Sequence, residues 1–359
     1  MNSSHPFQDG LAEIATGRRT LLLTGGGLAL STAASAGGAA SSAERRKRKP
    51  HLKRRAYVIV IDGCRPDELD EGLTPNLMAL RDGGTRYPRA SSMPIMETIP
   101  NHVMMMSGVR PDRSGVPANS IYDRAAAVVR TLDQPTDIKV KTVLERLNGK
   151  GFRTGTVLSK EYLYGVFGTR ATYRWEPSPT LPITEHAPDQ FTMAATLAMI
   201  DEVDPHLVFV NLGDIDRFGH ADLTGPLGLK ASRRAALADT DTLVGRFVDH
   251  LKSTGRWERS MVIVLADHSM DWSTPDRVIS LTAPLNADLL LAGRVQIACN
   301  GGADLVYWTG PDEQRTAAVT RIREIAAKVP GVLSTHPTTD DWLRLGPEAG
   351  DVVAYCAQG

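Results

Sequence analysis

Carboxylate and imidazole side chains follow three apolar runs of this sequence. Tyr57–Ile61 is followed by Asp62, Leu207–Val210 by Asp214, Asp216 and His220, and Met261–Leu265 by Asp267 and His268. Carboxylate oxygens and imidazole nitrogens are common ligands of divalent metal ions. A single run that ends in Asp would carry little information, because Asp commonly begins turns. Three runs that end in such side chains predict a metal site.

Thr98 offers a hydroxyl two residues before Pro100, and Pro favours the first turn of a helix. A hydroxyl at a helix N-terminus lies among unpaired N–H groups at the positive end of the helix dipole, which bind anions and stabilise an alkoxide. Asn101, one turn further on, could donate its amide to a phosphoryl oxygen. A threonine that only caps the helix would show the same pattern, so the residues alone leave both interpretations open.

The elements that must position these side chains have an α/β pattern. Short β-branched runs are typical of buried parallel strands, and ligands bind beyond the carboxyl ends of such strands. A further strand is predicted at Thr154–Leu158. Helices are predicted from Pro75 after an N-cap at Thr74, near Asn101, and at Lys139–Asn148, Phe191–Glu202, Leu229–Leu251 and Arg315–Lys328. Residues 110–130 and 160–190 are rich in Pro, Gly and aromatic residues, and we expect insertions that form a substrate pocket over the strand ends.

Composition and charge exclude some classes of partner. The chain has 359 residues, of which 42% are hydrophobic and 23% are charged, as in an ordinary soluble globular protein. Residues 1–55 hold ten Lys and Arg against three Asp and Glu, and the remaining residues hold 31 against 38. This acidic remainder argues against nucleic acid as a bulk partner. The three cysteines, Cys64, Cys299 and Cys356, have neither zinc-finger spacing nor the number of a disulfide framework.

The N-terminus has the pattern of an export signal. Arg18-Arg19 precedes a short apolar stretch that ends near Ala33, and Ala34-Ser35-Ala36 resembles a cleavage site. The stretch is too short for a stable transmembrane span. The paired arginines predict the twin-arginine export machinery as a partner, with an ordinary secretory signal as the alternative. We therefore expect an export signal at 1–36, a basic disordered linker at 37–55 and a hydrolase domain at 56–359, in a secreted, periplasmic or cell-envelope protein.

Four ordered motifs resemble one enzyme family. They are Ile61-Asp62-Gly63-Cys64-Arg65, Thr98-Ile99-Pro100-Asn101-His102 with Ser107-Gly108 after it, Asp216-Arg217-Phe218-Gly219-His220 with Gly225-Pro226 after it, and Ala266-Asp267-His268-Ser269-Met270. Together they resemble the nucleotide pyrophosphatase/type I phosphodiesterase family of the alkaline phosphatase superfamily. The resemblance covers most of residues 56–275.

The resemblance implies an alkaline-phosphatase-like fold, with a mostly parallel central sheet flanked by helices on both faces. It implies two divalent metal ions, with zinc preferred over manganese or iron. One ion would be held by Asp62, Thr98, Asp267 and His268, and the other by Asp216, His220 and a further histidine. It also implies hydrolysis of phosphodiester or nucleotide pyrophosphate bonds in a small-molecule substrate through a phosphorylated Thr98, with Asn101 as a catalytic donor.

The sequence departs from the family near its C-terminus. The last histidine of the family pattern is missing, and His336 is a weak substitute because its Ser334-Thr335-His336-Pro337 context differs. The strand-like end at Val352–Gly359 suggests a truncated domain. Two alternatives stay open. One is a phosphomonoester or phosphonate hydrolase in which Lys160 or Arg110 would clamp the phosphate, and the other is a catalytically impaired binding protein.

Overall fold

The structure is a computed structural model, which describes residues 54–69, 72–178, 185–221, 231–272 and 277–358. The predicted export signal and almost all of the predicted basic linker lie outside these residues. Within the described ranges, no helix combines the length and apolar character that a membrane crossing requires.

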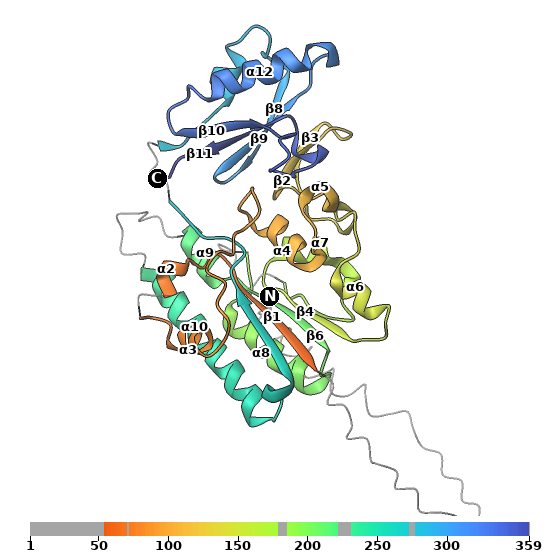
Figure 1. The fold of residues 1–359 in the computed structure, drawn as a ribbon, viewed down its shortest axis with the longest axis vertical. Helices are drawn as coiled ribbons and strands as arrows, with labels where there is room; N and C mark the ends of the chain where they lie inside the picture. The colour runs from red at the N-terminus through yellow and green to blue at the C-terminus, as the bar shows by residue number, and fades with distance from the viewer. Residues whose placement is uncertain (1–53, 70–71, 179–184, 222–230, 273–276, 359) are drawn as a thin grey trace, which may run out of the picture. The chain divides into compact units, whose positions relative to one another are not determined.

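A parallel sheet of five strands forms the centre of the domain (Figure 1). The strands run in the order β5 (Tyr173–Trp175), β4 (Thr154–Val157), β6 (Leu207–Leu212), β1 (Arg55–Ile61) and β7 (Ser260–Leu265). Ile61 pairs with Leu212 and Val60 with Leu265, so the carboxyl ends of these three strands lie level with one another. The predicted α/β fold with a parallel sheet is confirmed. Residues 160–190 are not simply an insertion, because β5 extends the sheet.

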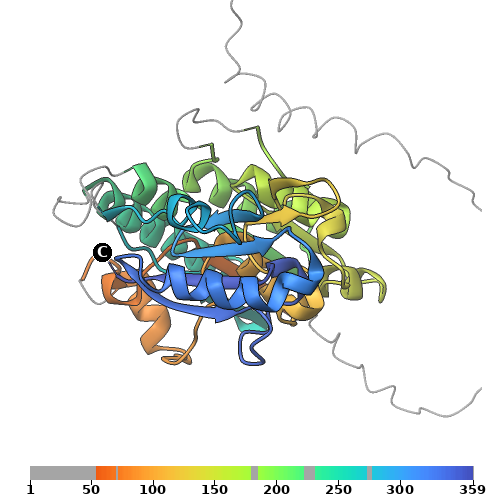
Figure 2. The same ribbon diagram turned by 90° about the horizontal axis from the view of Figure 1, so that it is seen from above.

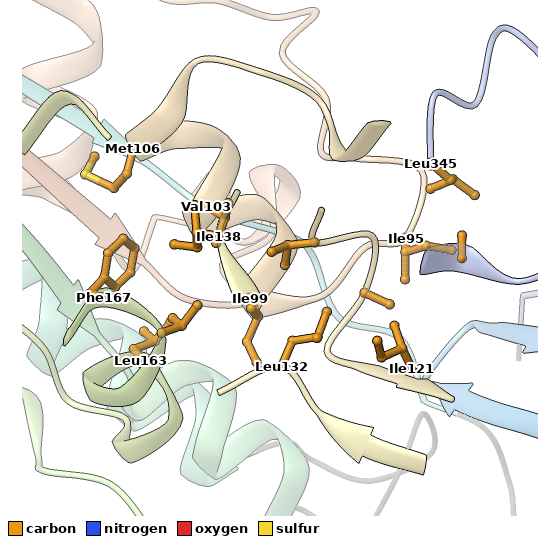
Figure 3. Packing of buried hydrophobic residues seen from close by; sticks show 14 of the residues in the cluster. Ile95, Ile99, Val103, Met106, Ile121, Leu132, Ile138, Leu163, Phe167 and Leu345 are labelled. Carbon is orange, nitrogen blue, oxygen red and sulfur yellow. The ribbon is translucent and has the colours of Figure 1, made fainter. Parts of the chain in front are cut away.

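Helices cover both faces of this sheet. Alternate residues of β1 point to opposite faces, as the period of two for a strand requires. Tyr57 and Ile59 pack in one core cluster with Phe247 and Ile200, while Val60 packs in the other. The first face carries α3 (Pro75–Asp82), α8 (Asp189–Glu202) and α10 (Ala231–Ser253), and the second carries α4 (Thr98–Ser107), α6 (Val143–Asn148) and α7 (Glu161–Phe167). The close-up shows Ile99 and Val103 of α4 within the second cluster (Figure 3).

A smaller antiparallel sheet follows the central one in sequence. Its strands have the order β10 (Val332–Pro337), β11 (Val352–Cys356), β9 (Ala303–Trp308) and β8 (Val295–Asn300). One face carries α11 (Thr282–Asn286) and α12 (Arg315–Ala326) (Figure 2). Ile322 of α12 lies in the same core cluster as Trp308. Leu305 and Val353, on this sheet, belong to the cluster that contains Ile99, so the two sheets share a core.

Short elements connect these layers. They are α2 (Pro66–Leu69), α5 (Pro111–Ser114), α9 (Asp214–Ala221), the hairpin of β2 (Ser120–Asp123) and β3 (Val128–Thr131), and the 3₁₀ turns Pro135–Asp137, Gly168–Arg170, Trp257–Arg259, Asp312–Gln314 and Pro347–Ala349. The side chain of Asn300 bonds both the N–H and the carbonyl of Ser120, which joins β8 to β2.

Two helix starts differ from the prediction for local reasons. The hydroxyl of Thr74 donates to the carbonyl of Leu69 and does not cap α3. Asp241 of α10 accepts hydrogen bonds from the N–H groups of Asn76 and Leu77 instead, so a distant side chain provides the cap. The helix predicted from Lys139 begins at Val143, because Thr142 and Glu145 form a capping box there.

Candidate active site

Three buried carboxylates meet at the carboxyl ends of β1, β6 and β7. Asp62 follows β1, Asp216 lies in the first turn of α9 after β6, and Asp267 follows β7. Each has one oxygen that is buried and accepts no hydrogen bond, namely Asp62 Oδ1, Asp216 Oδ1 and Asp267 Oδ2. Buried polar atoms are nearly always satisfied, so three such oxygens in one place need an explanation.

The other oxygen of each carboxylate is held firmly. Asn211 Nδ2 donates to Asp62 Oδ2 over 2.9 Å. The N–H groups of Gly63 and His268 donate to Asp267 Oδ1 over 3.1 Å and 2.9 Å. Gly63 has a φ of +69°, and a Cβ there would lie 3.1 Å from Cβ of Asp216, so glycine lets the turn after β1 approach that residue.

His268 is oriented as a metal ligand. Its Nε2 lies 3.2 Å from Thr98 Oγ1, 3.4 Å from Asp267 Oδ2 and 3.6 Å from Asp62 Oδ1. Its Nδ1 lies 2.7 Å from the carbonyl oxygen of Ser269, which requires the proton on Nδ1. Nε2 therefore faces the hydroxyl and the two carboxylates, and in the neutral ring it carries the lone pair that a metal ligand needs.

These donors fit a divalent cation. Asp62, Asp267 and His268 each offer one ligand atom, and the three atoms lie within 4.8 Å of one another. Two of the three residues, Asp62 and Asp267, each have one oxygen that accepts no hydrogen bond. A cation coordinated here would satisfy these oxygens, and Thr98 Oγ1 lies next to His268 as the resemblance implies.

Asp216 and His220 form a second pair of donors. They are separated by one turn of α9, and His220 Nε2 lies 3.3 Å from the unsatisfied Asp216 Oδ1. Asp214 is engaged elsewhere, because its Oδ1 binds His186 Nε2 at 2.7 Å. His336 lies in β10, where its Nε2 contacts the hydroxyl of Ser334 at 3.1 Å, so it does not join the pair.

A lysine that was not predicted as part of the metal site lies between the carboxylates. Lys160 Nζ is buried and lies 2.6 Å from Asp216 Oδ2, 2.8 Å from Asp62 Oδ2 and 3.5 Å from Thr98 Oγ1. Burial alone would lower the pKa of Lys160, but Asp216 and Asp62 raise it well above its ordinary value. Lys160 lies just after β4, which the sequence predicts as a strand. A cation beyond the end of a strand is the sequence signal that could have placed Lys160 in the site.

The three carboxylates respond differently to this environment. Burial raises the pKa of Asp62 to about 7, and the nearby charge of Asp267 acts in the same direction. Burial also opposes ionisation of Asp216, but the Lys160 ammonium outweighs it and holds the pKa of Asp216 well below its ordinary value. One carboxyl of the group thus keeps a proton more readily than the others.

Helix α4 begins at Thr98 and places its hydroxyl in the site. The carbonyl of Thr98 accepts a hydrogen bond from His102 Nδ1 at 2.8 Å, and burial lowers the pKa of His102 to about 4, so this ring is neutral. Asn119 Oδ1 accepts the N–H of Ile99, and Pro100 has none. The first turn therefore offers fewer free N–H groups than the sequence suggested.

Asn101 is bound to the loop before α4. Its Oδ1 accepts the N–H of Met93 and its Nδ2 donates to the carbonyl of Glu97. Its role as a catalytic donor stays a prediction. Asn119 is a second candidate, because its Nδ2 has no hydrogen bond within the described ranges and its Oδ1 is anchored at the start of the helix. Sequence reasoning missed Asn119, since no periodic pattern marks it.

Glu97 adds a fourth carboxylate near His268. Its Oε2 accepts the N–H of Asn119 over 2.8 Å, and it lies close enough to His268 and His220 for their charges to act on it. Burial nevertheless raises the pKa of Glu97 to about 7.

Comparisons with known proteins give a consistent result. The sequence model of the family described as type I phosphodiesterase/nucleotide pyrophosphatase matches residues 56–357. The bis(5'-adenosyl)-triphosphatase ENPP4 of Bos taurus is 26% identical over 242 residues, which cover 64% of this chain and 50% of that protein. Ectonucleotide pyrophosphatase/phosphodiesterase family member 1 of Mus musculus is 24% identical over 228 residues, 62% of this chain and 24% of that protein. The chain thus spans about half the length or less of these relatives.

Solved structures share the fold. Murine ectonucleotide pyrophosphatase/phosphodiesterase 5, in an inactive form with bound AMP, superposes with a TM-score of 0.66 at 18% identity, over 85% of this chain and 79% of that one. Phosphonoacetate hydrolase from Sinorhizobium meliloti 1021, in complex with phosphonoformate, gives a TM-score of 0.63 at 18% identity, over 85% and 81% of the two chains.

Proposed function

The chain belongs to the type I phosphodiesterase/nucleotide pyrophosphatase family, and from this membership we propose that it hydrolyses phosphodiester or nucleotide pyrophosphate bonds in small molecules. The observation that carries the proposal is the set of three buried carboxylate oxygens without hydrogen bonds beside Thr98 and His268. In a purely structural cluster of acids, the free-energy cost of burying these oxygens without hydrogen bonds would be uncompensated.

We propose two divalent ions, preferably zinc, as cofactors. Asp62, Thr98, Asp267 and His268 would hold the first, and Asp216 and His220 would contribute to the second. When bound, such ions lower the pKa of a coordinated hydroxyl and neutralise charge on the oxygens of a transferring phosphoryl group. Nitrogen and oxygen donors without thiolates suit zinc.

Thr98 acts as the nucleophile in this proposal. Its Oγ1 loses its proton to water and forms a bond to phosphorus, the bond from phosphorus to the leaving oxygen breaks with the electron pair on that oxygen, and a phosphothreonine results. Water then forms a new bond to phosphorus, the bond to Oγ1 breaks, and the threonine hydroxyl is regained. Lys160 Nζ, 3.5 Å from Oγ1, stabilises negative charge on that oxygen in both steps.

A neutral hydrogen-bond donor orients the transferring phosphoryl group. Asn119 Nδ2 donates to a phosphoryl oxygen, since the opposite end of its amide is fixed by Ile99. Loss of one preorganised donor of this kind typically costs about 2.7–4 kcal/mol in the transition state. His102 holds the carbonyl of Thr98 and so fixes the direction of the hydroxyl-bearing residue.

Hydrolysis of phosphomonoesters or phosphonates is the second candidate. The observation that favours it is the buried Lys160 ammonium beside Thr98, because a monoester places more negative charge next to the nucleophile than a diester does. Arg110, the other cation considered for this role, makes a bond of 3.4 Å to the carbonyl of Trp342 and is exposed.

Paired chromogenic substrates test the proposal. The wild-type chain with added zinc should hydrolyse bis-p-nitrophenyl phosphate faster than p-nitrophenyl phosphate, and Thr98→Ala should hydrolyse neither. Equal or faster monoester turnover would transfer the assignment to the second candidate. A wild-type chain that is inactive on both and on nucleotide pyrophosphates, with zinc bound, would support the impaired binding protein.

We also propose that the protein is exported, on the basis of Arg18-Arg19 and the apolar stretch after them. A fusion of residues 1–55 to a reporter should be exported only in cells with a working twin-arginine system, and replacement of both arginines by lysine should stop export. Export through the general secretory route alone would contradict the twin-arginine assignment.

A further inference from the structure

Arg217 carries a guanidinium group that the described part of the chain does not neutralise. It follows Asp216 directly on α9. Its Nε is buried without a hydrogen-bond partner, and no side-chain hydrogen bond or ion pair of Arg217 occurs among the described residues. A buried donor left unpaired typically costs about 1–3 kcal/mol, so its retention needs a reason.

The comparison with Arg233 shows what a structural arginine looks like in this fold. Arg233 is fully buried, and its guanidinium donates to both oxygens of Glu68 and to the carbonyls of Ile215 and Gly63. All of its nitrogens are therefore used to hold α10 against neighbouring elements. Among the residues that the structure describes, Arg217 has no such set of acceptors.

The ring of Tyr162 lies near both Arg217 and Lys160. The Arg217 Cζ lies 5.7 Å from the centre of the Tyr162 ring, and Lys160 Nζ lies 5.9 Å from the same centre. The two cations are close enough that the charge of Arg217 acts to lower the pKa of Lys160. Lys160 in turn contacts Asp216 and Thr98, so a row of Lys160, Tyr162 and Arg217 leads away from the nucleophile.

We propose that Arg217, held by the ring of Tyr162, forms a subsite for a second negative charge on the substrate. This inference rests on the proposed function and deepens it. A guanidinium presents its N–H groups in a planar fork that matches phosphate and carboxylate oxygens, and stacking on an aromatic ring fixes the direction of the fork. Lys160 is already engaged by two carboxylates, which leaves Arg217 as the cation of this row without an anion.

The second charge can come from two sources. It can lie on the leaving group, as the next phosphate of a nucleotide pyrophosphate does. It can also lie on the transferring group itself, as in a phosphomonoester. Both present anionic oxygens near the reacting phosphorus, which is the chemistry that Arg217 recognises.

Substrate selectivity of Arg217→Met tests the subsite. Bis-p-nitrophenyl phosphate is the reference diester with one negative charge, and p-nitrophenyl phosphate adds a second charge on the transferring group. The p-nitrophenyl ester of thymidine monophosphate is compared with a dinucleoside triphosphate, whose leaving group carries additional phosphate charge. We expect the ratio of kcat/KM for a substrate with more than one negative charge to that for the singly charged diester to fall about tenfold or more. Arg217→Lys should recover part of the ratio.

Arg246→Met is the control, because it also removes an arginine charge from a helix, here at an exposed position on α10. It should leave the ratio unchanged. A selective loss on the monoester assigns the second charge to the transferring group, and a selective loss on the triphosphate assigns it to the leaving group. Either outcome supports the subsite.

An equal loss on all substrates, or no loss, overturns it. Inhibition by inorganic pyrophosphate gives a second measurement that does not need turnover of a doubly charged substrate. Arg217→Met should weaken this inhibition about tenfold relative to inhibition by a neutral competitor. A wild-type chain that hydrolyses no phosphate ester contradicts the proposed function, whereas an active wild-type chain with an unchanged ratio in Arg217→Met overturns the subsite alone.

Discussion

Lys160 Nζ lies 2.6 Å from Asp216 Oδ2, and both side chains are almost completely buried. The pair joins the end of β4 to the first turn of α9, and Asp62 at the end of β1 shares the same ammonium at 2.8 Å. One cation thus balances two of the three carboxylates of the site. The charge balance of the site therefore depends on this lysine.

Replacement of Lys160 by Met should destabilise the chain when divalent ions are removed by a chelator. Loss of one partner of a buried ion pair leaves an uncompensated charge and typically costs about 3–5 kcal/mol. Added zinc should restore part of the loss, because the ion replaces the missing positive charge. Urea unfolding with EDTA and with zinc measures both effects. Lys328→Met, at an exposed position, is the control, and an equal loss in both variants would contradict the assignment.

Thr98→Ala should abolish turnover while leaving most metal binding in place. In the proposed mechanism the Thr98 hydroxyl is the nucleophile, whereas Asp62, Asp267 and His268 still supply three donors within 4.8 Å of one another. Thr98→Ser should keep measurable activity, since it keeps a hydroxyl. Phosphate release and metal content by atomic spectroscopy give the two measurements. A Thr98→Ala chain with most of its activity would exclude the phosphothreonine.

The parts of the site that lie on strand ends could be predicted from the sequence. Asp62, Asp216 and Asp267 follow recognisable apolar runs. Parallel pairing of the three strands brings the ends of these runs to the same edge of the sheet, independently of the connecting loops. Lys160 was predictable only as a nearby cation, because the length of its side chain allows several partners.

Contacts between distant segments could not be predicted. Arg217 and Tyr162 are 55 positions apart, and Asn119 meets Ile99 through a turn whose conformation leaves no periodic signature. Tertiary contacts also replaced a predicted local cap, since Asp241 and not Thr74 caps α3. Hydrophobic periodicity reports which face of an element is buried, and it carries no information about such polar pairings.

Asp204→Asn should lower the free energy of unfolding at neutral pH, and this effect should decrease in acid. Asp204 pairs with the buried Arg55 at the start of β1. Burial opposes its ionisation, but the hydrogen bonds from Arg55 outweigh this and lower the pKa of Asp204 below its ordinary value of 3.8. A lowered pKa contributes stability above the unfolded pKa and loses it as the pH falls through the folded value.

The expected difference is therefore about 1 kcal/mol at pH 7 and smaller near pH 3. Urea unfolding at the two pH values measures it. Asn suits the positive φ of 48° at this position, so the substitution changes the charge with little backbone strain. A constant difference at both pH values would show that the ion pair is not its cause.

A positive charge introduced on β7 should reduce self-association of the protein. β7 pairs with β1 alone among the described strands, and Met261 and Ile263 on one of its faces are 57% and 39% exposed. An exposed apolar edge strand is a template for pairing with other chains. Ile263→Lys should lower light scattering at high concentration, whereas Leu333→Lys, at an exposed apolar position on β10, should have less effect if β7 is the principal edge. Equal effects would contradict this role of β7.

Metal titration should show two unequal sites. Asp62, Asp267 and His268 converge on one point, and each donor is oriented by a hydrogen bond to its other atom. Asp216 and His220 offer only two donors, and Asp216 must also give up part of its contact with Lys160. An incomplete ligand set that competes with an ammonium binds an ion weakly, so calorimetry with zinc should resolve a tight and a weak step. Asp267→Asn should remove the tight step and His220→Ala the weak one; loss of both steps in either variant would mean that the ions share one site.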